Sequence, residues 1–348
     1  MIYLNAGNLW TKSYLDDVIR LNSQHDDIKV KTLFGSIANL TPTARSFDRL
    51  PYLKWQEIDH FIDRARIHNI NIRYTLNASC IGSLQDFKFT WWNRSLREDI
   101  YELHNIGVNE WTVTSPLLIE CLREMFPDDF IEVSTIAEVA TPEDAVRWYA
   151  LGANGVNVST SINRNAYVLG RMVDAPLTVS ILANEACLWK CPWRRECYNL
   201  SSHNSERSIL LWGNYPFSRC NAQRMKNPEE WIKARMVLPS WLDYYHDTLG
   251  VQWFKIAYRT HPLEVALPIL RFYMDKTDPE SLLGLWPTIA RLAFSKEPQD
   301  MTNISCKKLE EHKMLDVLVK NMDSDHCETY KCGTGCTLCS WLYQKAKV

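Results

Sequence analysis

The sequence lacks any hydrophobic run long enough to form a membrane-spanning helix. None of its apolar stretches approaches about 18 residues, the length at which such a helix becomes a candidate. The first residues, Met1-Ile-Tyr-Leu-Asn-Ala-Gly, carry no basic segment and no cleavage-like stretch, so they predict a strand and not a signal peptide. From these two absences we expect a cytoplasmic protein with no membrane partner.

The chain also lacks an excess of charge of either sign. Its 39 Lys and Arg residues face 41 Asp and Glu residues, which gives a net charge of -2. Nucleic-acid-binding proteins usually carry a strong basic excess, so this balance weighs against such a partner but leaves room for a local basic groove. A hydrophobic fraction of 46% excludes disorder for most of the 348 residues.

Several catalytic and phosphate-binding motifs are missing. Neither GxGxxG nor GxxxxGK[ST] occurs, which weighs against the nucleotide-binding α/β folds. There is no HExxH helix, and no Ser, His and Asp arrangement can be proposed from the spacing of these residues. These absences weaken the case for a zinc protease or a serine protease.

What the sequence does contain is a regular alternation of short apolar runs and amphipathic helical segments. The runs carry few charges, as strands of a parallel sheet covered by helices do. Eight such strands predict a (β/α)8 TIM-barrel-like fold, with a doubly wound open sheet as the alternative. The predicted strands are 2–6, 28–34, 70–77, 110–114, 130–135, 155–159, 177–182 and 252–257.

Helix boundaries are marked by capping residues. Thr141 before Pro142, and Asn227 before Pro228, each place a cap oxygen and a proline at a predicted helix start. Glycine tolerates the left-handed conformation that ends a helix. Three glycines stand directly before a predicted strand: Gly107, Gly152 and Gly250. One buried helical face is predicted at Ile58, Phe61, Ile62 and Ala65.

The alternation breaks in two places, and both breaks are rich in cysteine. We expect a barrel domain over 1–296 that carries an insertion at about 183–225, followed by a C-terminal extension over 297–348. Long insertions in barrels usually lie at the carboxyl ends of the strands, where the chemistry takes place. The insertion is therefore the first place to look for a site.

The insertion holds four cysteines with the spacing C-x3-C-x5-C-x22-C: Cys187, Cys191, Cys197 and Cys220. In a chain without an export signal, clustered cysteines indicate metal ligation or catalysis more than disulfides. Four thiolates can hold one [4Fe–4S] cluster, and this spacing suits a cluster better than the paired knuckles of structural zinc. Zinc and unligated thiols remain alternatives, and Cys80, after the third strand, competes for a ligand position.

The extension holds a denser group with the spacing C-x4-C-x3-C-x2-C: Cys327, Cys332, Cys336 and Cys339. This density predicts a metal site. A second iron–sulfur cluster is our preferred interpretation, with zinc or no metal as alternatives. Cys121 and Cys306 are predicted to be core residues.

Several stretches of the chain resemble the peptidase U32 family, over roughly residues 1–275. They are Tyr74-Thr-Leu-Asn-Ala-Ser-Cys80, Asn184-Glu-Ala-Cys187 with Cys191-Pro192 and Arg194, Ser202-His203, Trp231-Ile-Lys-Ala-Arg235 with Pro239, and Phe254-Lys-Ile-Ala-Tyr-Arg259. The resemblance implies a TIM-barrel-like domain with a cysteine-held [4Fe–4S] cluster. Some members of that family were named collagenase-like proteases. Others act in oxygen-independent hydroxylation of ubiquinone precursors or of RNA bases, with prephenate implicated as the hydroxyl donor. The compact C-x3-C-x5-C spacing departs from the family's broader pattern.

Two thiolate groups favour redox chemistry over hydrolysis. Our leading hypothesis is an iron–sulfur-dependent oxidoreductase that hydroxylates a small-molecule, peptide or natural-product substrate without oxygen, with prephenate as a candidate donor. The alternatives are a U32-type peptidase and a non-catalytic iron–sulfur subunit that passes electrons to a homologous partner. An electron donor or such a partner subunit is the protein partner that we expect.

Polar residues near predicted strand ends are the candidates for catalysis. Arg259 could bind a carboxylate through two parallel hydrogen bonds from its guanidinium, and Asn77 could orient a substrate. His203, in the insertion, and Asn5, at the first strand, are further candidates. The competing interpretations are an arginine paired with a barrel carboxylate and an asparagine that caps a helix.

Overall fold

The structure, a computed structural model, describes residues 1–38, 40, 43–80, 94–205, 215–286, 303–320, 326–329, 332 and 335–348. Parts of the predicted insertion and extension, including 206–214 and 297–302, lie outside these residues.

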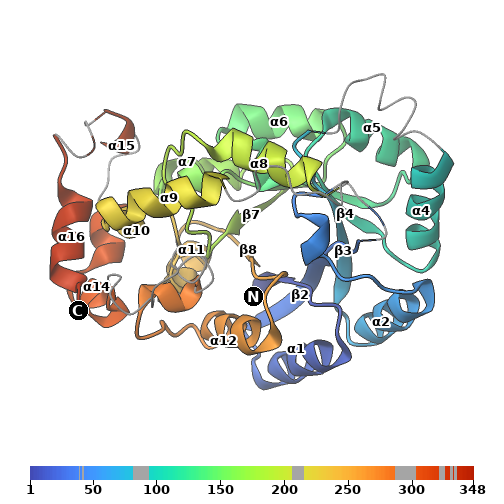
Figure 1. Cartoon of the computed structure of the whole chain (residues 1–348), viewed down its shortest axis with the longest axis horizontal. Coiled ribbons are helices and arrows are strands. Elements are labelled where there is room, and N and C mark those ends of the chain that lie inside the picture. Colours follow the sequence, from blue (N-terminus) through green and yellow to red (C-terminus); the bar gives the residue numbers. More distant parts are fainter. Residues whose placement is uncertain are drawn as a thin grey trace.

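Eight parallel strands close into a barrel in chain order, with helices around it (Figure 1). The strands are β1 Ile2–Gly7, β2 Ile28–Gly35, β3 Asn71–Leu76, β4 Glu110–Val113, β5 Phe130–Val133, β6 Gly155–Asn157, β7 Thr178–Leu182 and β8 Trp253–Ile256. All eight predicted strands and the (β/α)8 fold are confirmed, and the open sheet is wrong, because β1 also pairs with β8.

Helices cover the barrel between the strands. They are α1 Lys12–Gln24, α2 Trp55–Ile67, α4 Arg94–Asn105, α5 Pro116–Met125, α6 Pro142–Ala150, α7 Ala166–Met172 and α12 Leu263–Met274. After β7 come α8 Arg194–His203, α9 Tyr215–Lys226, α10 Glu230–Lys233 and α11 Leu242–Asp247, and the extension carries α14 Cys306–Glu311, α15 His326–Thr329 and α16 Leu338–Ala346. The described helices include none with the length and apolarity needed to cross a membrane.

The capping signals were right at one predicted helix start and wrong at the other. The Thr141 side chain accepts a hydrogen bond from the Asp144 amide, as expected. Asn227 instead contributes its backbone carbonyl to the Glu230 amide, so residues 227–229 form a turn and the helix begins at Glu230. The three predicted helix-ending glycines do have positive φ angles: Gly107 104°, Gly152 104° and Gly250 74°.

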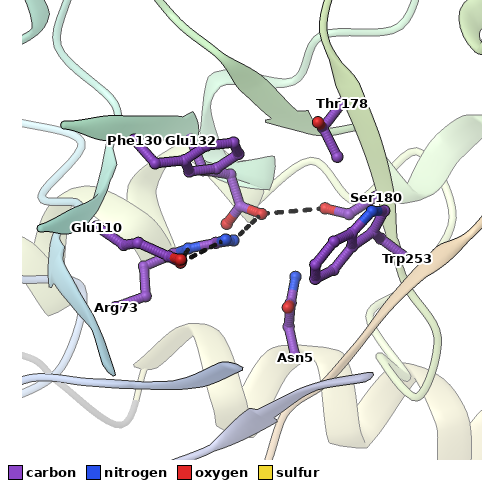
Figure 2. Close-up of a pocket in the computed structure, with 8 residues that line it drawn as sticks. All are labelled: Asn5, Arg73, Glu110, Phe130, Glu132, Thr178, Ser180 and Trp253. Carbon is purple, nitrogen blue, oxygen red and sulfur yellow. Dashed lines mark hydrogen bonds and ion pairs between the residues drawn. The ribbon is translucent and has the colours of Figure 1, made fainter. Parts of the chain in front are cut away.

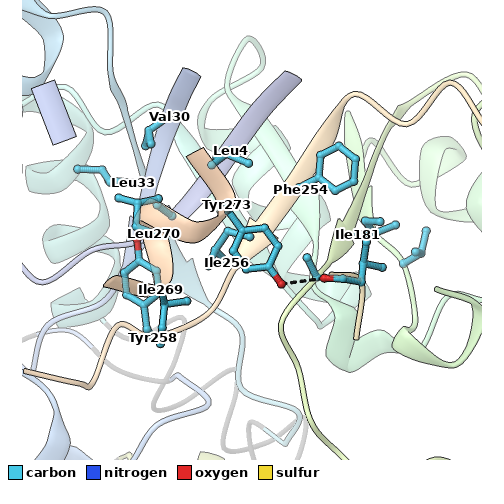
Figure 3. Packing of buried hydrophobic residues seen from close by; sticks show 14 of the residues in the cluster. Leu4, Val30, Leu33, Ile181, Phe254, Ile256, Tyr258, Ile269, Leu270 and Tyr273 are labelled. Carbon is cyan, nitrogen blue, oxygen red and sulfur yellow. Dashed lines mark hydrogen bonds between the residues drawn. The ribbon is translucent and has the colours of Figure 1, made fainter. Parts of the chain in front are cut away.

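The apolar core lies between the barrel and its helices. The buried face of α2 consists of the four predicted residues. Figure 3 shows Ile269 and Tyr273 of α12 in the same apolar layer as Ile256 of β8. The Tyr273 hydroxyl donates to the Val237 carbonyl at 2.8 Å, which ties α12 to the segment before β8. Cys306 is buried and Cys121 packs against the core, as predicted.

The barrel interior near the amino ends of the strands is charged and balanced. Arg73 of β3 pairs with Glu110 at 2.7 Å and with Glu132 of β5 at 2.6 Å. Lys255 of β8 donates to the other Glu132 oxygen at 2.8 Å. Figure 2 shows Arg73, Glu110 and Glu132 around a cavity of about 220 Å³. Asn5 also lines this cavity and so lies at the amino-end layer, not among the groups at the barrel mouth.

Candidate functional site

Arg259 follows β8 and lies at the carboxyl ends of the strands, the barrel mouth. Its guanidinium donates to the hydroxyl of Ser36 at 3.3 Å, to that of Thr43 at 3.3 Å, and to that of Thr75. All three are neutral oxygens, and within the described residues no carboxylate forms an ion pair with Arg259. Among the described residues, the alternative of an arginine paired with a barrel carboxylate finds no support.

A second guanidinium stands near Arg259. Burial, then the nearby charge of Arg45, lower the pKa of Arg259 well below its ordinary value. Burial also lowers the pKa of Arg45, although Glu185 acts in the opposite direction. Each arginine disfavours the charge of the other, so an anion bound between them would relieve the repulsion. This arrangement favours a negatively charged group at the mouth.

Asn77 holds the segment that carries Arg45. Its side-chain oxygen accepts hydrogen bonds from the Thr43 hydroxyl and from the Ala44 amide, both at 3.2 Å. Its amide nitrogen donates to Ser134 at 3.4 Å. The strand-end position predicted for Asn77 is correct, and these bonds make it a positioning residue for the loop.

His203 does not join this group. It is exposed at the end of α8, where it lines a surface pocket with Pro192 and Asn199. The structure gives it no hydrogen bond to Arg259 or Asn77. A neighbour on α8, Ser202, is the residue that contacts the mouth, since it accepts a hydrogen bond from the Ser79 amide at 2.8 Å.

The four insertion cysteines gather beside the mouth. Cys187 and Cys191 lie in the loop after β7, Cys197 lies on α8, and Cys220 lies on α9, which packs against α8. Cys197 is electrostatically coupled to Cys191 and Cys220, and Cys187 to Cys197. Burial raises the pKa of Cys197 to about 12, and that of Cys187 well above its ordinary value. As they stand, no three described His, Cys, Asp or Glu side chains are close enough together to hold an ion.

The donor set nevertheless fits an anionic iron–sulfur cluster. Four thiolates give a cluster site a negative charge, and two arginines lie where they would offset it. Arg194 is coupled to Cys187 and Arg45 to Cys197. Arg194 also donates to the Leu188 carbonyl at 2.9 Å, which fixes the cysteine loop. Cluster binding would require the thiols to lose their protons and move closer together.

Cys80 lies next to this group. The preceding residue, Ser79, donates to the Asn199 side chain of α8 at 2.7 Å, two residues beyond Cys197. Whether Cys80 replaces one of the four ligands stays a prediction.

Sequence reasoning missed Arg45, Glu185 and Arg224. Glu185 is 7% exposed, and its Oε2 atom has no hydrogen-bond partner in the structure. Arg224 of α9 donates to the Ala186 carbonyl and lies over the Trp231 ring at 4.8 Å, which holds α9 against the cysteine loop. Only for Glu185 was there a signal, because it stands beside Asn184 and Cys187 in the motif.

Comparisons with known proteins give one curated relative and several similar solved structures. No family model matches the chain. A Methanocaldococcus jannaschii protein named "Uncharacterized protease MJ1657" is 27% identical over 236 residues, which are 66% of this chain and 68% of that protein. The solved U32 peptidase Mk0906 is 19% identical, with a TM-score of 0.48 over 74% of this chain and 91% of its own. A D-psicose 3-epimerase from Clostridium cellulolyticum H10 is 12% identical, with a TM-score of 0.37 over 72% of this chain and 99% of its own.

Proposed function

From the assignment of this chain to the peptidase U32 family, which its motifs indicate and its curated relative supports, we propose an enzyme that binds a carboxylate-bearing substrate at the barrel mouth. The observation that carries this proposal is the pair Arg259 and Arg45. In the described part of the chain Arg259 presents a guanidinium held by neutral hydroxyls, and a carboxylate would accept two parallel hydrogen bonds from it.

Two reaction classes suit such a site, and the relative's name favours peptide hydrolysis. The M. jannaschii protein is called a protease, and a peptide presents a carboxylate at its C-terminus and on acidic side chains. In this reading Arg259 binds and orients the peptide. Asn77 and the hydroxyls of Ser36 and Thr43 keep the mouth in shape.

Oxygen-independent hydroxylation is the second candidate, and the four insertion thiols favour it. Cys187, Cys191, Cys197 and Cys220 would hold a [4Fe–4S] cluster beside the arginines, and such a cluster supplies electron transfer or a Lewis-acidic iron. Arg259 would then orient a carboxylate-bearing substrate or donor. Prephenate, which has two carboxylates, stays a prediction as the donor.

The carboxylate proposal is tested with peptides that differ only in their C-terminal group. We expect free-acid peptides to bind the full chain at least tenfold more tightly than the matching amides, measured by calorimetry. Arg259→Met should abolish this preference. Arg171→Met, which removes an exposed arginine paired with Glu143, is the matched control and should keep it. Equal binding of acid and amide would refute the proposal.

The reaction class is tested by the products. Anaerobically purified protein is incubated with the peptides and with prephenate as the hydroxyl donor, before and after iron is removed with a chelator, and products are identified by mass spectrometry. Cleavage that survives iron removal means hydrolysis. A product that gains one oxygen atom, formed before but not after iron removal, means hydroxylation.

A further inference from the structure

We propose that Cys327, Cys332, Cys336 and Cys339 form a tetrathiolate zinc site, distinct from the cysteine group of the insertion and docked on arginines of the barrel. The four residues line one pocket together with Lys233 of α10. The proposal is independent of the substrate and of the reaction at the barrel mouth.

The backbone places these four cysteines around one pocket, and their side chains would have to turn toward a common point to bind an ion. Cys332 and Cys336 pair through an isolated β-bridge, Cys327 lies on α15, and Cys339 lies on α16. The His326 imidazole nitrogen Nε2 lies 3.5 Å from Cys336 Sγ, a hydrogen-bond distance for sulfur. Outer partners of this kind orient metal ligands and tune their basicity.

The spacing of the extension cysteines matches zinc. Structural zinc sites place consecutive ligands about two to four residues apart within each knuckle. In the extension all three gaps fall in that range, because four, three and two residues separate the cysteines. In the insertion the second and third gaps are five and 22 residues, outside it. The extension spacing is therefore compatible with zinc, and the insertion spacing is not.

The size of the pocket also distinguishes an ion from a cluster. The space between the extension cysteines is about 20 Å³, enough for about one water-sized sphere. A single zinc ion fits such a space once the thiols close to about 2.3 Å from it. A [4Fe–4S] cluster has eight atoms and would need the surrounding side chains to move further apart than a single ion would.

The barrel supplies positive charge on the side that faces the pocket. Arg164 is 3% exposed, and its guanidinium donates to the carbonyls of Ile232 at 2.6 Å and Met236 at 2.9 Å, which are neutral acceptors. Arg164 and Arg235 both act electrostatically on the Cys339 thiol. Four thiolates around Zn²⁺ carry a net charge of two minus, which these arginines would offset. The helix α16, beside α10 in Figure 1, packs against it and carries Cys339 to this surface.

Metal analysis of the full chain tests the site. We expect about one zinc per chain, retained in Cys191→Ser and lost in Cys332→Ser. Cys332 is chosen because its side chain is exposed, so its replacement should disturb the fold little. Cys121→Ser, outside both groups, is the matched control and should keep the zinc. Iron should follow the opposite pattern and be lost only in Cys191→Ser. Loss of iron in Cys332→Ser with no zinc in the wild-type protein would overturn the proposal.

Cobalt substitution tests the ligands without any variant. Wild-type protein freed of zinc should bind one Co²⁺ with the visible bands of a tetrahedral tetrathiolate site. Arg164→Gln should weaken zinc binding by roughly 10–100-fold in competition with a chelator, the usual effect of an outer partner. Octahedral cobalt spectra, or no cobalt binding, would refute the site even if the cysteine variants fail to fold.

Discussion

The two ends of the barrel surround an arginine with opposite kinds of group. At the amino ends, Arg73 lies between Glu110 and Glu132, within 2.7 Å of both. At the carboxyl ends, Arg259 is held by neutral hydroxyls and stands near Arg45. Burial lowers the pKa of both arginines, but the two glutamates more than offset this for Arg73 and raise its pKa.

The different partners of the two arginines distinguish a charge that stabilises the fold from a charge that is available to bind a ligand. A buried ion pair that is fully hydrogen-bonded is costly to break, because the partner left behind is an unpaired charge. A guanidinium held by neutral hydroxyls recovers less of its desolvation cost than one paired with carboxylates. In barrels of this type the amino-end face serves stability and the carboxyl-end face serves chemistry. The contrast between Arg73 and Arg259 follows this division.

Removing the paired arginine should have the largest effect on stability. Arg73→Met would remove the ion pair of Glu110 and one of the two ion pairs of Glu132, which would keep its pair with Lys255. We expect the free energy of unfolding to fall by about 3–5 kcal/mol, measured by urea denaturation. The exposed Arg171→Met should change it little, and a similar small loss for Arg73→Met would erase the contrast between the two ends.

The pH dependence of stability should report the same network. Burial alone would raise the pKa of Glu132, but Arg73 and Lys255 outweigh burial and lower it to about 2. Because the folded pKa is below the ordinary value of 4.5, this contribution is complete above about pH 4.5 and is lost as the pH falls toward 2. Glu132→Gln should flatten the decline in that window, measured by thermal melts, whereas Glu143→Gln at an exposed site should not.

A smaller effect should follow from a methyl group placed against the mouth. A Cβ on Gly7 of β1 would lie 2.8 Å from the Arg259 backbone nitrogen, so the segment carrying Arg259 must shift. We expect Gly7→Ala to cost about 1–3 kcal/mol of stability and to weaken carboxylate binding as well. Gly170→Ala, with open space around its Cβ, is the control. Unchanged binding in Gly7→Ala would mean that the position of Arg259 is not critical.

Removing the unpaired arginine should have the smallest effect on stability. Arg259→Met deletes a charge that has no carboxylate partner, so the free energy of unfolding should change by less than about 1 kcal/mol. The same variant should lose its preference for free-acid peptides. A large loss of stability would show that Arg259 belongs to the structural class of Arg73.

Much of the fold could be predicted because its signals are local. Strand positions follow from apolar runs, and the turns before strands follow from the backbone freedom of Gly107, Gly152 and Gly250. One cap failed because Asn227 used its carbonyl in a turn, a choice that residue type alone does not reveal. At the site, Arg259 was found from its strand-end position, but Asn77 turned out to support a loop and His203 to face a separate surface pocket.

By itself, the sequence determined the eight-stranded barrel, the cysteine-rich insertion and the presence of two four-cysteine groups. These depend on residue type and on spacing along the chain. The tertiary structure alone decided which charges are neutralised. Arg73 meets Glu132, and Arg259 comes near Arg45, only when distant segments close around the barrel. Electrostatic balance depends on distance in space, and that distance is fixed by packing and not by position in the chain.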